Sequence, residues 1–286
     1  MFGIAERLSR ADKELMDVLD RRVDVPALPA LIEAIRPNEI TGQTIGDTAI
    51  CLDSSVFLRL ASHPKSPDMI DYLRARHPAP LILPGQAVQE FWNNQLQAVD
   101  TMSSSLRKKL DAFKTEFESI DPHFGEYSAK FNALVSEFSE QHGHVYDEAT
   151  VRKTGRLFDV LQGAAIVPFV PRLTFAPVAR QRQLTRTPPG FRDGGDGDFF
   201  IWADLLRGLQ LAKKRRQKFV RVVLATEDKK PDWSRSGVPH PVLAAEVRAL
   251  FKVRFVIWKL ERLAREVVAV SQTEPDLHID EQNPAE

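Results

Sequence analysis

Three short, almost continuous apolar runs do most to limit the folds open to this chain. They are TAICL at 48–52, PLILP at 80–84 and FVRVVLAT at 219–226. Such runs are typical of strands that are buried on both faces of a parallel sheet. The first two lead into stretches with helical spacing of apolar residues, SSVFLRLASHP with Ser54 or Ser55 near its start, and 86–97. The alternation predicts a layered α/β fold with a mostly parallel central sheet.

The remaining segments complete this fold. Residues 171–198 hold few long apolar runs, several arginines and the string TPPGFRDGGDGD, so we expect an exposed, functional loop there. Apolar spacing predicts helices at 199–214, 241–250 and 259–268, and a last strand, FKVRFVIW, at 251–258.

The chain divides into three parts. Residues 1–45 form an N-terminal extension, in which two short helices broken by Pro26 pack on the core. Residues 46–270 form the main domain. Within it, 103–163 carries seams of Leu and Phe at helical spacing, which predict a helical hairpin inserted outside the sheet. The acidic, apolar-poor tail 271–286 is expected to be disordered.

Composition excludes several classes of protein. The chain has 286 residues, of which 43% are hydrophobic, so it is long enough to bury a real core. With 39 basic and 39 acidic residues, no global field draws it to nucleic acid or to anionic membrane. No stretch approaches the roughly 20 apolar residues of a membrane-spanning helix. A single cysteine, Cys51, fits a reducing compartment, and a cytoplasmic location is expected.

Four acids recur after or beside the predicted strands. Asp53 ends the first run, Glu90 follows the second, Asp228 follows the third, and Asp198 opens the helix at 199–214. Each has an ordinary alternative: Asp53 as a helix cap, Glu90 as a solvated helix residue, Asp198 as a helix N-cap and Asp228 as a turn former. Ligands of open parallel sheets bind at the carboxyl ends of the strands, so the recurrence favours one shared site.

Clustered carboxylates repel one another unless a cation lies among them. Oxygen ligands without cysteine or clustered histidine favour Mg²⁺ or Mn²⁺ over zinc. One or two such ions would polarise phosphoryl oxygens and activate water, so the four acids are candidate catalytic residues and metal ligands for phosphodiester hydrolysis.

Four segments carry a family resemblance. ICLDSSVFLRL, LPGQAVQEFWNN, PPGFRDGGDGDFFIW and VVLATEDKKPDW resemble the four acidic motifs of PIN-domain nucleases, in particular a PIN-like subgroup with a helical insertion before a PPGF-x-D segment. The resemblance spans roughly residues 48–265. It implies a PIN-like three-layer sandwich and a metal-dependent endonuclease, with RNA as the expected substrate, acting in a toxin, defence or RNA-turnover setting.

Carried over by position, the family's four acids fall on Asp53, Glu90, Asp198 and Asp228. Asp193, in GFRD, matches a further acid of the subgroup and is a candidate additional ligand. Asp196 and Asp232 are either auxiliary acids or loop residues. Ser55 stands where many relatives have asparagine, so it offers a hydroxyl in place of an amide.

A polyanion needs local positive charge on a chain with no net charge. Arginines crowd the segment before Asp198 and lysines follow Asp228, and arginine grips phosphate through two hydrogen bonds. Solvated surface charge is the alternative. The predicted nucleic-acid contacts are Arg180, Arg182, Arg186, Arg192, Lys229 and Lys230.

Three functions stay open. The first is a metal-dependent endoribonuclease with Mg²⁺ or Mn²⁺ as cofactor. The second keeps this chemistry but acts on DNA. The third is a binding or scaffold module with a vestigial acidic pocket, in which the helical insertion docks a protein partner or a second copy of the chain. No contact with membrane is expected.

Overall fold

The computed structural model describes residues 8–35, 44–93, 155–192 and 194–273, and scattered residues between 109 and 136. A five-stranded sheet lies at its centre, and all neighbouring strands in it are parallel. The predicted α/β class with a parallel central sheet is therefore confirmed. In spatial order, the strands are β3 (Ala165–Ile166), β2 (Leu81–Ile82), β1 (Thr48–Leu52), β4 (Arg221–Ala225) and β7 (Arg254–Trp258).

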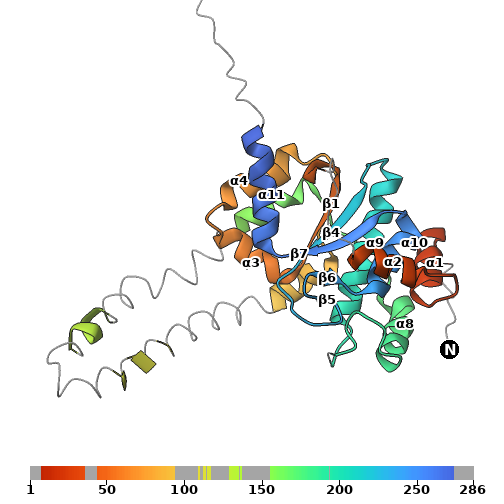
Figure 1. Ribbon diagram of the computed structural model, residues 1–286, viewed down its shortest axis with the longest axis horizontal. Coiled ribbons are helices and arrows are strands. Elements are labelled where there is room, and N and C mark those ends of the chain that lie inside the picture. Colours follow the sequence, from red (N-terminus) through yellow and green to blue (C-terminus); the bar gives the residue numbers. More distant parts are fainter. Residues whose placement is uncertain are drawn as a thin grey trace, which may run out of the picture.

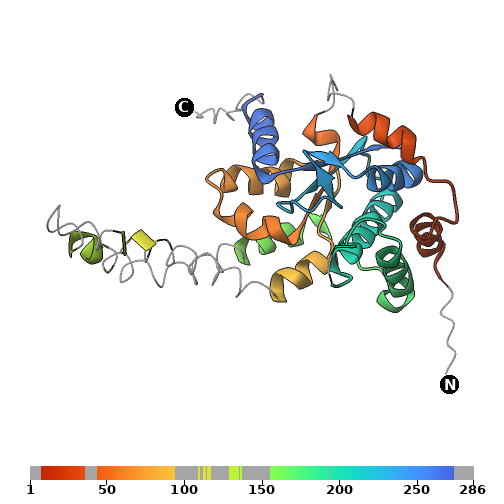
Figure 2. The same ribbon diagram turned by 60° about the horizontal axis from the view of Figure 1, so that its bottom comes forward.

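Helices cover both faces of the sheet (Figure 1). On one face lie α3 (Ser54–Ser62), α4 (Ser66–Asp71) and α11 (Leu260–Thr273), and on the other lie α9 (Gly197–Lys214) and α10 (Pro241–Phe251). Figure 2 shows the same layering from a second direction. Because the sheet is covered twice, every residue of β1 and β4 is buried, as the continuous apolar runs predicted.

The order of the strands creates a switch point in the sheet. From β1 the chain moves outward to β2 and β3, and it then returns to place β4 on the other side of β1 and β7 beyond it. Right-handed crossovers that run in opposite directions along a sheet place their helices on opposite faces. The connection that leaves β1 and the connection that leaves β4 therefore lie on opposite faces and diverge between these two strands. Crevices at such a point, beyond the carboxyl ends of the strands, are the usual ligand sites of open α/β sheets.

The two predicted N-terminal helices are present as α1 (Arg10–Leu19) and α2 (Ala27–Ile35). The Ser9 hydroxyl caps α1 by accepting a hydrogen bond from the backbone N–H of Asp12. Both helices pack against α10. A 3-10 turn, η1 (Ile45–Asp47), precedes β1, and a π-helical turn, η2 (Tyr72–Arg76), follows α4.

The expectation of an exposed loop over 171–198 is wrong in its first half, where the chain forms helix α8 (Arg172–Leu184). Phe175, Val178 and Ala179 are spaced to bury one side of that helix, while Pro177 and the arginines hid the pattern. Strand β3 and a small hairpin, β5 (Ser234–Arg235) and β6 (Val238–Pro239), were also not predicted, because each strand has only two residues.

The predicted helical insertion is described only in part. Every described residue from 109 to 162 is helical, and the last stretch, 155–162, packs in the core. There Phe158 makes edge-to-face contacts with Phe57 of α3 and with Phe91 of the helix at 85–93. The hairpin turn and residues 274–286 lie outside the described residues. Within the described part of the chain, no helix is both long and apolar enough to cross a membrane.

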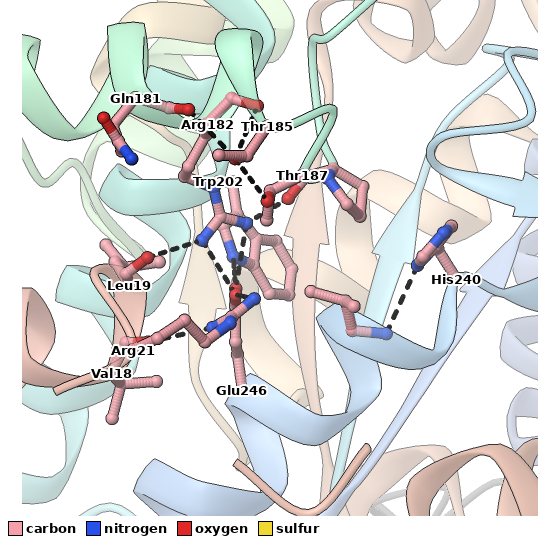
Figure 3. A network of polar contacts seen from close by, with 12 residues as sticks. Val18, Leu19, Arg21, Gln181, Arg182, Thr185, Thr187, Trp202, His240 and Glu246 are labelled. Carbon is pink, nitrogen blue, oxygen red and sulfur yellow. Dashed lines mark hydrogen bonds and ion pairs between the residues drawn. The ribbon is translucent and has the colours of Figure 1, made fainter. Parts of the chain in front are cut away.

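A buried charged cluster joins the helices on one face (Figure 3). Glu246 of α10 is fully buried and accepts hydrogen bonds from the Arg182 guanidinium at 2.8 Å and from the Trp202 indole at 2.6 Å. Arg21, which follows α1, forms an ion pair with the same carboxylate at 2.6 Å. Arg182 also donates to backbone carbonyls of Leu19 and Pro188. One carboxylate therefore connects α1, α8, α9 and α10.

Removal of the buried guanidinium is expected to destabilise the fold. Arg182→Met leaves Glu246 with one fewer counter-charge and two carbonyls without a donor, so the free energy of unfolding should fall by about 3 kcal/mol or more. Arg180→Met is the matched control, because Arg180 is exposed on the same helix and its loss should change stability by less than about 0.5 kcal/mol. Urea unfolding of both variants measures this, and equal effects would contradict the assignment.

Candidate functional site

Asp53 lies at the switch point, directly after β1. Its backbone N–H donates to the carbonyl of Ala225, the last residue of β4, at 3.0 Å. Asp53 is only 8% exposed. The side chain does not cap α3, although Asp53 occupies the N-cap position of that helix. The alternative of a simple helix cap therefore does not describe this carboxylate.

Two hydroxyl groups hold the Asp53 carboxylate in place. Ser55 Oγ donates to Oδ2 at 2.6 Å, and Thr226 Oγ1 donates to the same oxygen at 2.7 Å. Ser55 Oγ also accepts from the backbone N–H of Glu227 at 3.0 Å. The hydroxyl of Ser55, the residue that departs from the motif pattern, thus connects the segment after β1 to the segment after β4. Thr226 was missed from sequence, although a hydroxyl residue directly after a buried strand is a usable signal.

Asp228 belongs to the turn after β4. Its backbone N–H donates to Thr226 Oγ1 at 3.0 Å, so one hydroxyl contacts both this acid and Asp53. Its Oδ1 accepts from the backbone N–H of Lys230 at 2.7 Å, as in a common turn of aspartate residues. The turn-forming role considered for Asp228 is present, and its second oxygen is still directed to a cation.

That cation is the ammonium group of Lys230. Its Nζ lies 3.1 Å from Oδ2 of Asp228 and 2.8 Å from Oδ2 of Asp198. Asp198 stands in the first turn of α9, where the helix dipole favours a negative charge. The side chains of Asp198 and Asp228 are 11% and 20% exposed. Lys230 was predicted as a contact to nucleic acid, but in this structure it pairs two of the candidate acids.

Glu90 approaches the same place from the helix at 85–93. A Cβ atom at Gly197 would lie 2.3 Å from Oε1 of Glu90, so the carboxylate rests against the start of α9, one residue before Asp198. Gln86, one turn earlier, donates to that oxygen at 3.0 Å. Glycine at 197 therefore permits the close approach between Glu90 and α9.

A fully buried acid that sequence analysis did not single out, Asp204, fixes this approach. From α9 it accepts the backbone N–H groups of Gln86 and Val170, at 2.9 and 2.8 Å, and both guanidinium nitrogens of Arg172. Burial raises the pKa of Asp204, while the hydrogen bonds from Arg172 and the backbone lower it. One carboxylate thus attaches the Glu90 helix to the helix that carries Asp198.

The PPGF segment is also anchored. Gly190 has φ +87°, and a Cβ there would lie 3.1 Å from Cβ of Asp198, so both conformation and space require glycine. Its N–H donates to Oδ2 of the buried Asp232 at 2.9 Å. Asp232 is thereby a structural acid of the loop, and Asp196 is the N-cap residue of α9. Asp193 lies outside the described residues.

Intervening residues therefore bring the segments of all four candidate acids together at the carboxyl edge of the sheet. Asp53 and Asp228 share the Thr226 hydroxyl, Asp228 and Asp198 share Lys230, and Glu90 meets α9 beside Asp198. Among the described residues, however, no three or more Asp, Glu, His or Cys side chains are grouped closely enough to hold a metal ion. The Lys230 ammonium lies between two of the acids, Asp198 and Asp228, and offsets part of their charge.

The predicted basic contacts separate into two groups. Arg180, Arg186, Arg192 and Lys229 are exposed. Arg182, by contrast, is 3% exposed and bound to Glu246, so the prediction that it contacts nucleic acid is wrong. Sequence analysis could not separate these arginines, because the buried partner, Glu246, lies far along the chain in a different helix.

Comparison of the chain with protein-family models, with curated proteins and with solved structures finds no match.

Loss of the shared hydroxyl is expected to destabilise this edge. Thr226→Val keeps the shape of the side chain but removes one donor to Asp53 and leaves the Asp228 N–H without its acceptor, so the free energy of unfolding should fall by about 1–3 kcal/mol. Ser54→Ala is the control, because its hydroxyl approaches Asp53 only at 3.4 Å. Chemical denaturation measures the free energy of unfolding of both variants. An unchanged value for Thr226→Val would refute the shared contact.

Proposed function

We propose that this protein is a PIN-like, metal-dependent endonuclease that cleaves single-stranded RNA at the carboxyl edge of its sheet. The observation that carries the proposal is the succession of contacts that brings Asp53, Glu90, Asp198 and Asp228 to one edge from four separate segments. The predicted succession of buried strands, each followed by an acid, supports it as well. So does the resemblance of these four segments to the PIN motifs.

The four carboxylates are the groups that would hold Mg²⁺ or Mn²⁺. Their hard oxygen atoms suit these ions, and the proposal is supported by the positive charge of Lys230 that already lies between Asp198 and Asp228. When bound, such an ion supplies polarisation of the phosphoryl oxygens and activation of the attacking water. The protein itself then needs no nucleophilic side chain.

The residues around the acids have separate tasks in this proposal. Ser55 and Thr226 fix one oxygen of Asp53, so the other oxygen keeps a defined direction. Lys230 neutralises Asp198 and Asp228, and its flexible stem lets the ammonium group turn instead to a substrate phosphate. The exposed Arg186, Arg192 and Lys229 bind phosphates along the strand and set its register.

Two substitutions separate catalysis from binding. Asp228→Asn keeps the shape of the side chain but removes a charged ligand, so cleavage should fall more than about a hundredfold even at saturating RNA. Arg186→Ala removes a phosphate contact, so it should weaken binding and leave most of the chemical step. Single-turnover cleavage of labelled RNA with Mn²⁺, over a range of protein concentrations, measures both.

A thermal unfolding measurement is the control that both variants fold. Cleavage by Asp228→Asn at the wild-type rate would refute the nuclease assignment and favour a binding module. Failure of Arg186→Ala to recover at saturation would refute its role in binding alone.

A glycine pair tests the position of Glu90. In Gly197→Ala the new methyl group would lie 2.3 Å from Oε1 of Glu90, which has to move. The flexible end of a glutamate moves at little cost in stability, and alanine favours the helix. Affinity for Mn²⁺, measured by titration calorimetry, should fall by about 10- to 100-fold.

Gly195→Ala is the matched control, because Gly195 lies just before α9 and nothing lies within 4 Å of a Cβ at that position. It should bind Mn²⁺ like the wild type. Equal affinities in all three proteins would remove Glu90 from the metal site.

A further inference from the structure

A pocket of about 580 Å³ lies beside the acidic edge and contains none of the four acids. Helix α2 forms one wall, the hairpin β5–β6 forms another, and Phe191 and Arg192 of the PPGF-x-D segment close it. Cavities that bind small molecules commonly have volumes of about 300–1,000 Å³. The residues around it are Leu31, Ile35, Phe191, Arg192, Pro231, Arg235, Ser236, Val238, Pro239, His240 and Pro241.

The lining combines a flat apolar surface with positive charge. Leu31, Ile35 and Val238 offer aliphatic side chains, and Phe191 offers an aromatic ring. Arg192 and Arg235 are exposed and carry the charges. Aromatic and apolar surface stacks on any nucleobase, and guanidinium groups bind phosphate. A planar ring joined to an anion, as in a nucleotide, is complementary to both parts of this lining.

His240 adds a polar group of defined orientation. Its Nδ1 accepts a hydrogen bond from the backbone N–H of Val242 at 3.2 Å, so a neutral ring carries its proton on Nε2. Burial lowers the pKa of His240, against the opposing charges of Asp232 and Glu246, which keeps the ring neutral near pH 7. The lining therefore includes an imidazole whose proton is on Nε2 in its neutral form.

The pocket adjoins the acids through two short segments. Phe191 follows Gly190, at which a Cβ would lie 3.1 Å from Cβ of Asp198. Pro231 is three residues beyond Asp228, a span of at most about 11 Å for an extended chain. A nucleic acid strand advances by about 3.4 Å per nucleotide even when stacked, so a few nucleotides cover this distance.

We propose that this pocket binds one nucleotide of the single-stranded substrate, with its base on Phe191 and Val238 and its phosphate at Arg192 and Arg235. The inference rests on the proposed nuclease function and adds to it a binding position outside the acids. It assigns to α2 and the β5–β6 hairpin a role in holding the substrate strand.

Three variants test the pocket without relying on cleavage. Val238→Trp fills it, Arg235→Ala removes one charge, and Arg215→Ala removes a matched charge at the far end of α9, which is about 27 Å long by its 18 residues. Binding of labelled single-stranded RNA in chelator, followed by fluorescence anisotropy, should weaken about fivefold or more in the first two and less than twofold in the control.

The salt dependence separates the two contacts. Arg235→Ala should reduce the slope of log affinity against log salt by about 0.7, while Val238→Trp should leave the slope unchanged because it removes no charge. AMP and UMP should compete with the RNA for the wild-type protein and not for Val238→Trp. Thermal unfolding checks the fold, and the exposed Arg235 keeps the test valid if Val238→Trp fails to fold.

Wild-type affinity in Arg235→Ala and Val238→Trp would overturn the pocket assignment, as would an absence of RNA binding by the wild type. Cleavage of the same RNA with Mn²⁺ is a separate readout. If cleavage at a subsaturating protein concentration is unchanged in both variants, the pocket proposal fails and the nuclease proposal stands. If no cleavage occurs with Mn²⁺ while the variants weaken binding as stated, the nuclease proposal fails alone.

Discussion

The parallel pairing of β1 with β4 is the constraint on which the rest of this structure depends. The pairing runs from Thr48 opposite Arg221 to Leu52 opposite Ala225, so the two strands end together. Asp53 and Thr226 are then the residues that directly follow these two neighbouring strands, and a hydrogen bond of 2.7 Å joins their side chains. The meeting of residues so far apart in sequence follows directly from this register. Without it, the acids after these strands would have no common edge.

Buried charges determine how the other two acids reach that edge. Asp204 attaches the Glu90 helix to α9, and Glu246 attaches α8 and α1 to α10. Both carboxylates are fully buried and each receives several donors, the condition under which a buried charge is tolerated. Asp198 and Asp228 at the edge differ in that they remain partly exposed and share one flexible lysine, Lys230. The fully buried acids Asp204 and Glu246 therefore hold helices together.

Sequence patterns predicted the buried strands well, because β1 and β4 are continuous apolar runs. They failed for α8, where apolar residues occupy only one side and Pro177 and arginines interrupt the pattern. Arg182 and Arg180 are two residues apart and look alike in sequence, yet one is buried against Glu246 and the other is exposed. The roles of Asp204 and Lys230 depend on contacts between distant segments, which no local pattern reports.

The most direct test of the central claim is the metal dependence of cleavage. Labelled single-stranded RNA and single-stranded DNA of one sequence are incubated with the purified protein in Mn²⁺ and in excess chelator, with Asp228→Asn purified in parallel to exclude contaminating nuclease. The account predicts internal cleavage of RNA with Mn²⁺, less or none of DNA, and none of either with chelator. Cleavage that persists in chelator, or intact RNA at every Mn²⁺ concentration, would contradict it.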